Sequence, residues 1–225
     1  MQIKIKNYLD PKKNFKSLKD KKKLLKKLFK KNLKFKSFFE TFNSNYNYSL
    51  KHINFKNISK FQNIIVIGMG GSILGSKAIY SMFFNKVKKN FYFLDNLKNY
   101  ESFSWIKKKD NLKQNFFIII SKSGNTLETL INFSILKNYI NKNNSIIMAE
   151  STNNELKKIS LDLKIPFVTH KYYIGGRYSV LSEVGMLPAK IMGLNIKNFK
   201  KNINFVRTRI EISKKNKFIN CLSGI

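Results

Sequence analysis

The sequence predicts an α/β fold, a doubly wound parallel five-stranded sheet preceded by an amino-terminal helical segment. Short runs rich in β-branched and aromatic residues alternate with longer stretches of helical periodicity. The runs are apolar throughout, which is typical of strands buried on both faces of a parallel sheet. Turns rich in glycine or serine follow two of the runs, at the positions where open parallel sheets bind their ligands.

The expected elements follow from these patterns in chain order. Strands are predicted at residues 64–67, 91–94, 116–120, 145–149 and 166–169. Helices are predicted at residues 20–35, 72–84, 97–107, 126–140, 153–161, 181–192 and 197–213. Because crossovers between parallel strands are right-handed, the helices are expected to cover both faces of the sheet.

The formal net charge of +32 calls for an interpretation of its own. Of the 44 basic residues only three are arginines: Arg177, Arg207 and Arg209. Proteins that read bases or hold phosphates in bidentate fashion are usually richer in arginine, so no specific nucleic-acid partner is expected. Lysine shares A/T-rich codons with the abundant Asn, Ile and Phe. The charge therefore indicates drift of exposed positions towards lysine, with selected polyanion binding as the alternative.

The single cysteine, Cys221, excludes an internal disulfide and fits a reducing compartment. The longest apolar runs are strand-length, well below the roughly 18 residues that a membrane-spanning helix needs. The first residues, MQIKIKNYLDPKKN, lack the apolar block of a secretion signal. We expect a cytoplasmic protein without a membrane partner.

The first glycine-rich turn, GMGGSILG, spans residues 68–75 after the first predicted strand. Its glycines allow a ligand close to the backbone, and Ser72 adds a hydroxyl donor. A dinucleotide fingerprint would need glycine where this chain has Ile73. In that alternative Asp95 would bind a ribose, whereas it is otherwise a cap or turn residue. The turn by itself indicates a ligand site without identifying the ligand.

The second motif, SKSGNT at residues 121–126, follows the third predicted strand and opens a helix. It brings three hydroxyls, one ammonium group and a glycine to a helix amino terminus. Such a loop can receive a compact phosphate monoester, whereas an ordinary helix cap needs only one of these side chains. The loop does not match the GxxxxGK[ST] pattern of nucleotide hydrolases. A phosphate monoester site is therefore the favoured interpretation.

The third motif, GGRYSVLS at residues 175–182, places Arg177 beside two glycines at the start of a helix. An arginine held in this way can stabilise negative charge that develops on a ligand. A structural salt bridge is the alternative role for Arg177.

In this order along the chain, GMGGSILGSKA, SKSGNTLETL and GGRYSVLSEVGMLPA resemble the glucose-6-phosphate isomerase family of the sugar-isomerase (SIS) superfamily. The resemblance covers residues 60–195. It implies interconversion of glucose 6-phosphate and fructose 6-phosphate through a cis-enediol, without a metal or an organic cofactor. It also implies the following roles: Gly71 and Ser72 contact the sugar phosphate, Ser121, Lys122, Ser123 and Thr126 hold the phosphate, Gly124 and Asn125 complete the loop, and Arg177 stabilises the enediolate.

The reaction further needs a base that moves a proton between two carbons. In the family this base is a glutamate downstream of the GGR motif, and a histidine and a lysine that assist ring opening lie further on. No stretch after Arg177 matches them. His52 and His170 match no catalytic motif and are expected to be structural or surface residues.

Three acidic residues are candidates for the site. Glu128 either helps to line it or packs and caps its helix, and Glu150 and Glu183 have no stronger claim. We therefore expect an amino-terminal fragment of the enzyme, which binds sugar phosphate weakly and does not turn it over.

The expected organisation has three parts. Residues 1–60 form a lysine-rich helical segment, residues 61–195 a SIS-type sugar-phosphate-binding domain, and residues 196–225 a basic helical segment that leads into a second domain. The resemblance implies a homodimer of the complete protein. A non-catalytic phosphosugar sensor is the alternative function, but such sensors usually carry a helix-turn-helix, and residues 1–60 show one amphipathic helix without a recognition helix.

Overall fold

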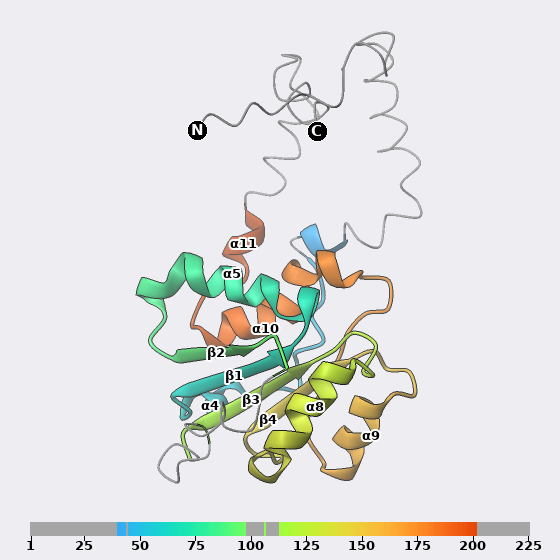
Figure 1. Ribbon diagram of the computed structural model, residues 1–225. Helices are drawn as coiled ribbons and strands as arrows, with labels where there is room; N and C mark the ends of the chain where they lie inside the picture. The colour runs from blue at the N-terminus through green and yellow to red at the C-terminus, as the bar shows by residue number, and fades with distance from the viewer. Residues whose placement is uncertain (1–39, 44, 98–105, 107–112, 202–225) are drawn as a thin grey trace, which may run out of the picture.

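The computed structural model describes residues 40–43, 45–97, 106 and 113–201. Within them, five parallel strands form one sheet in the order β2-β1-β3-β4-β5 (Figure 1). The strands are β1 (Asn63–Gly68), β2 (Asn90–Leu94), β3 (Asn115–Ile120), β4 (Ser145–Ala149) and β5 (Phe167–Thr169). This confirms the predicted α/β class and the five-stranded parallel sheet.

Helices cover both faces of the sheet, as a doubly wound fold requires. In Figure 1, α5 and α10 lie on one face and α8 and α9 on the other. The described α-helices are α4 (Phe55–Ser59), α5 (Leu74–Phe83), α8 (Leu127–Leu136), α9 (Glu155–Asp162), α10 (Glu183–Ile191) and α11 (Asn198–Lys201). Short 3-10 helices at Glu40–Phe42, Gly70–Ser72, Phe84–Lys86, Lys137–Tyr139 and Gly176–Leu181 complete the described helical structure.

Successive side chains of the central strands enter two separate cores. In β1, Ile64 and Val66 pack on the side of α5 and α10, whereas Ile65 and Ile67 pack on the side of α8 and α9. All six residues of β1 and all six of β3 are buried. Because both faces are covered, these strands need apolar residues at every position. This accounts for the continuous apolar runs in the sequence.

Two of the predicted helices begin where a side chain caps them. The helix predicted from residue 153 begins at Glu155, because the side chain of Asn154 accepts the backbone N–H of Lys157 (3.0 Å) and so caps α9. The helix predicted from residue 181 begins at Glu183, because Ser182 caps α10. The predicted helix at 20–35, and most of those at 97–107 and 197–213, lie outside the described residues.

The chain before β1 contributes to the core on the α10 side of the sheet. Leu50, Ile53, Ile58 and Phe61 are all buried there, and α4 contacts α10. The short helix α4 was not predicted, since five residues carry too little periodicity to be recognised. Its start is fixed by Asn54, whose side chain accepts the backbone N–H of Asn57.

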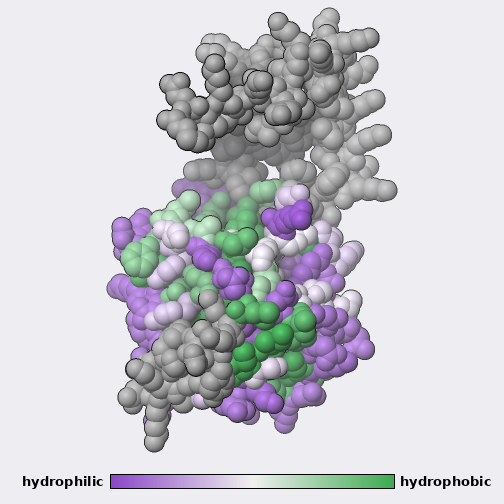
Figure 2. Space-filling model, in the orientation of Figure 1, coloured by the Kyte–Doolittle hydropathy of each residue, from purple (hydrophilic) through white to green (hydrophobic). Residues whose placement is uncertain are grey.

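The surface of the described residues is mostly hydrophilic, with an apolar area over α8 (Figure 2). Leu127 and Ile131, one helical turn apart, are exposed there, while Phe133 and Leu136 are buried against the sheet. Lys200 is the one lysine buried among the described residues. Of the other described lysines, Lys89, Lys122, Lys157 and Lys171 are half-buried and the rest are exposed.

A buried polar network joins the segment before α4 to α10 and α11. Glu183 is 1% exposed, and its carboxylate accepts hydrogen bonds from the Tyr46 hydroxyl and the Ser49 backbone N–H, both at 2.9 Å. The Lys200 ammonium lies 4.4 Å from the Tyr46 ring centroid and 4.5 Å from that of Tyr48. It finds no hydrogen-bond acceptor among the described residues. The two aromatic faces stabilise this cation in place of water.

This environment makes stability depend on pH. Burial lowers the pKa of Lys200 from 10.5 to about 8, an effect opposed by Glu183 and reinforced by Lys171. Between these two values the unfolded chain holds a proton that the folded protein has released, so the free energy of unfolding rises with pH. At still higher pH the effect reverses, because burial raises the pKa of Tyr46 and the unfolded chain then ionises first.

We therefore expect Lys200→Met to increase the free energy of unfolding at pH 7 and to reduce its rise above pH 8. Urea unfolding at a series of pH values measures both effects. Lys201→Met is the matched control, because Lys201 is the exposed neighbour in the same helix and should change neither. Equal pH profiles for the two variants would contradict the assignment.

Candidate functional site

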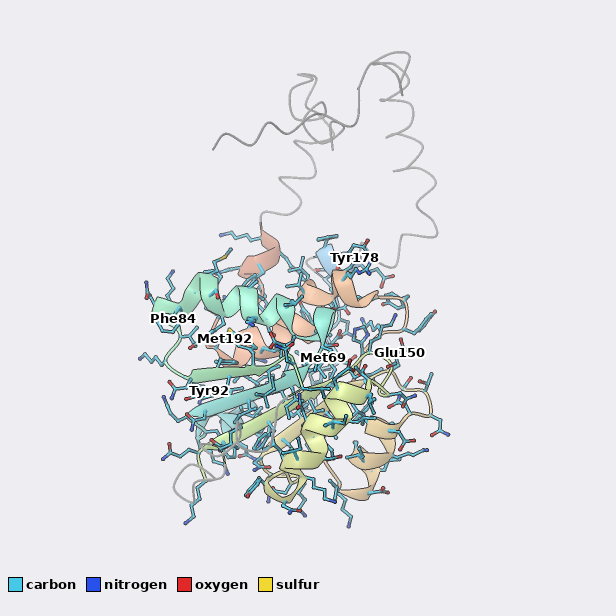
Figure 3. The ribbon with its side chains drawn as sticks, viewed as in Figure 1. Met69, Phe84, Tyr92, Glu150, Tyr178 and Met192 are labelled. Atoms are coloured by element: carbon cyan, nitrogen blue, oxygen red, sulfur yellow. The ribbon has the colours of Figure 1, made fainter. Side chains whose placement is uncertain are left out.

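A cavity of about 320 Å³ lies beyond the carboxyl ends of β1, β3 and β4. This is the edge at which open parallel sheets bind ligands. Figure 3 places Met69 and Glu150 at this edge, next to the first turn of α8. The cavity is lined by Met69, Gly71, Ser72, Lys122, Ser123, Thr126, Glu150 and Gly176.

All three sequence motifs contribute to this one cavity. Five of the nine predicted site residues line it: Gly71, Ser72, Lys122, Ser123 and Thr126. The other four, namely Ser121, Gly124, Asn125 and Arg177, lie beside lining residues in the chain. Residues that are far apart in the sequence thus meet as the motifs suggested.

The 121–126 loop is held in shape by its own hydrogen bonds. A 2.8 Å hydrogen bond joins the hydroxyls of Ser121 and Thr126, and the Gly124 N–H lies 3.2 Å from the Ser121 hydroxyl oxygen. The Asn125 N–H donates to the Ser123 hydroxyl. Ser121 is buried, so its hydroxyl shapes the loop. Lys122, Ser123 and Thr126 are the residues of the loop that line the cavity.

The loop is also attached to the segment that leads from β4 into α9. Three backbone N–H groups of that segment donate to it: Glu150 to Lys122 O (3.0 Å), Glu155 to Asn125 Oδ1 (2.9 Å) and Leu156 to Gly124 O (3.1 Å). Asn125 thus uses its side chain to satisfy a free N–H at the start of α9. These bonds fix the loop on the ends of two adjacent strands.

Glycine is required where the first and third motifs meet. A Cβ atom on Gly71 would lie 2.2 Å from the carbonyl oxygen of Gly176, far inside contact distance. The Ser179 hydroxyl lies 2.7 Å from the Gly176 carbonyl oxygen and 3.2 Å from that of Gly71, so it is shared between the two segments. The close backbone approach brings Gly176 to the cavity wall. Arg177, whose side chain is exposed, is the next residue in the chain.

The charges that line the cavity are those of Lys122 and Glu150. Their side chains form an ion pair of 3.5 Å, in which the Lys122 side chain is 34% exposed and that of Glu150 is 20% exposed. No motif in the sequence assigns Glu150 a role in the site. It directly follows β4, however, so its place at the carboxyl end of a buried strand was a usable signal.

The remaining candidates are not among the residues that line the cavity. Glu128 is exposed on the first turn of α8, and Glu183 belongs to the buried network described above. His52 is exposed, and its Nε2 donates to the Phe167 carbonyl (2.8 Å). His170 is buried, and its burial lowers the pKa of the imidazole. Asp95 forms an ion pair with Lys77 at 2.7 Å.

In the part of the chain that the structure describes, no helix has both the length and the apolar character needed to cross a membrane.

Comparisons with known proteins identify relatives of this chain. Three curated relatives are named glucose-6-phosphate isomerase. The protein from Methanocaldococcus jannaschii is 37% identical over 145 residues, 63% of this chain and 36% of its own length. That from Borrelia garinii is 39% identical over 61% of this chain and 27% of its own length, and that from Campylobacter jejuni is 33% identical over 66% and 38%. The chain thus spans about a third of the length of these relatives.

Solved structures agree with the fold. A hypothetical protein from Thermus thermophilus matches with a TM-score of 0.65 and 19% identity over 92% of this chain and 50% of its own. A glucose-6-phosphate isomerase from Chlamydia trachomatis matches with a TM-score of 0.56 and 22% identity over 72% of this chain and 32% of its own. The sequence model of the phosphoglucose isomerases aligns with residues 9–209, beyond both ends of the three motifs. Since that alignment takes in most of the chain, the chain belongs to the phosphoglucose isomerase family.

Proposed function

We propose that this chain supplies the sugar-phosphate-binding part of a glucose-6-phosphate isomerase, an enzyme that interconverts glucose 6-phosphate and fructose 6-phosphate. The family membership supports this reaction. The observation that carries the proposal is the meeting of Lys122, Ser123 and Thr126 with two glycine backbones in one cavity at the amino terminus of α8. A cation, two hydroxyls and the positive end of a helix suit a phosphate monoester.

The phosphate then anchors the substrate while the sugar extends towards the first and third motifs. Ser72, from the first motif, also lines the cavity. Isomerisation places negative charge on an enediolate oxygen, and the guanidinium of Arg177 is the group that we assign to its stabilisation. The backbone contact between Gly71 and Gly176 fixes the position of the Arg177 backbone.

Proton transfer between the two carbons needs a base, and we assign it to neither Glu183 nor Glu128. Glu183 is buried and already accepts two hydrogen bonds. Glu128 is exposed and does not line the cavity. A glutamate beyond the GGR motif, as the family uses, is the base that we propose.

We further propose that the longer protein works as a homodimer in the cytoplasm, with hexose phosphates as its partners and neither nucleic acid nor membrane. A cavity for a single phosphate supports the absence of a nucleic-acid partner, since phosphate binding in it should depend only weakly on salt. Polyanion binding by the whole basic surface would instead show a steep dependence on salt.

The direct test is a titration of the isotope-labelled 225-residue chain with fructose 6-phosphate, followed by the backbone amide signals of residues 121–126. Lys122→Ala should weaken binding about thirtyfold, as the loss of a cation–phosphate contact suggests. Lys142→Ala, at an exposed turn position, is the control for the loss of one positive charge and should leave binding unchanged. Saturable shifts confined to residues outside the loop would contradict the proposal.

A further inference from the structure

Glu150 places a carboxylate in the wall of a cavity that is otherwise suited to an anion. Its backbone is fixed on both sides. The N–H donates to the Lys122 carbonyl (3.0 Å), and the carbonyl accepts from the side-chain amide of Asn154 (3.0 Å). Asn154 is itself buried and caps α9. The backbone of Glu150 is therefore held in place, and its side chain pairs with Lys122 in the cavity wall.

The carboxylate competes with a bound phosphate for the same cation. Its described ionic partner is Lys122, at 3.5 Å, and Lys122 is also the cation that faces a phosphate in the cavity. A bare phosphate dianion is repelled by Glu150 and gains nothing from it. A ligand that carries hydroxyl groups beside its phosphate can donate hydrogen bonds to the carboxylate, which is an acceptor only.

We infer that Glu150 is a specificity-determining residue, which makes the cavity prefer polyhydroxylated phosphate esters over inorganic phosphate. The inference rests on the proposed function, because it requires the phosphate to bind at the 121–126 loop. It also explains how a strongly basic chain can discriminate among phosphate-bearing anions. A chain with a net charge of +32 attracts every phosphate-bearing anion, and a carboxylate inside the cavity opposes those that offer charge alone.

The test compares two ligands, inorganic phosphate and fructose 6-phosphate, on the full 225-residue chain at pH 8, where both phosphates are dianions. Glu150→Gln keeps the shape of the side chain and removes its charge. Inorganic phosphate should bind about tenfold more tightly, the order expected when a unit charge is removed a few ångströms from a dianion. Fructose 6-phosphate should gain much less, because the amide replaces one acceptor oxygen with a donor. The preference for the sugar ester should fall several-fold.

Glu155→Gln is the matched control. Glu155 carries the same charge, is exposed at the start of α9 and pairs with Lys158 (2.7 Å). Its substitution should leave the preference unchanged. If Glu150→Gln tightens both ligands by the same factor, or behaves like Glu155→Gln, the inference is wrong even though Lys122→Ala still weakens binding. If neither ligand binds the unchanged chain, or Lys122→Ala has no effect, the proposed function is wrong. This inference, which rests on it, is then wrong as well.

Discussion

Glu183→Ala is expected to lower the free energy of unfolding by about 4 kcal/mol, because it removes a buried charged acceptor with two hydrogen bonds. The Tyr46 hydroxyl would be left buried without its acceptor, and the Ser49 N–H would lose its partner. The Lys200 ammonium would also lose the nearby negative charge that favours its protonated form. Urea unfolding followed by circular dichroism measures the loss, provided that the m-value is unchanged.

Two further variants separate charge from shape. Glu183→Gln keeps the volume and one acceptor oxygen, so we expect a smaller loss than for alanine. Combining it with Lys200→Met should recover part of that loss, since the uncompensated cation is then absent as well. Glu155→Ala, which removes an exposed carboxylate from a surface ion pair, should change stability by less than about 1 kcal/mol. A Glu183→Ala loss no larger than that of Glu155→Ala would contradict the importance of the network.

The sheet could be predicted from the sequence because its strands obey a local rule. Each buried parallel strand is a continuous apolar run. A strand can therefore be recognised from its own sequence, as at residues 64–67 and 116–120, without knowledge of its neighbours. The buried network could not be predicted in this way. Tyr46 and Glu183 are 137 residues apart in the chain, and nothing local to either residue indicates the other.

The candidate site was predictable to the extent that motifs mark it. Lys122, Ser123 and Thr126 stand out because hydroxyls and a cation gather at a helix start. Which residues of a motif reach the cavity depends instead on tertiary contacts. The Asn125 side chain accepts a hydrogen bond at the start of α9, whereas Glu150, from a segment without any motif, lines the cavity. A rule that examined every residue after a buried strand would have included Glu150 but could not have indicated its pairing with Lys122.

Gly124→Ala should lower the free energy of unfolding by about 3 kcal/mol and abolish detectable binding of fructose 6-phosphate by the loop. Gly124 has a φ of +70°, which disfavours any side chain. A Cβ atom there would lie 1.9 Å from Oδ1 of Asn154. Asn154 cannot move aside without loss, because the same oxygen accepts the Lys157 N–H and its amide donates to the Glu150 carbonyl. Calorimetric or urea unfolding measures the first effect, and the titration described above the second.

Gly193→Ala separates steric contact from backbone strain. Gly193 has a φ of +83°, but a Cβ atom there would meet nothing within 4 Å. Its substitution should therefore cost only the conformational strain, about 1 kcal/mol. The difference between the two variants then measures the contact between Gly124 and Asn154, in which the phosphate loop and the cap of α9 compete for the same space. Equal losses would mean that the loop needs glycine for its dihedral angle alone, and that Asn154 yields without disturbing the residues that line the cavity.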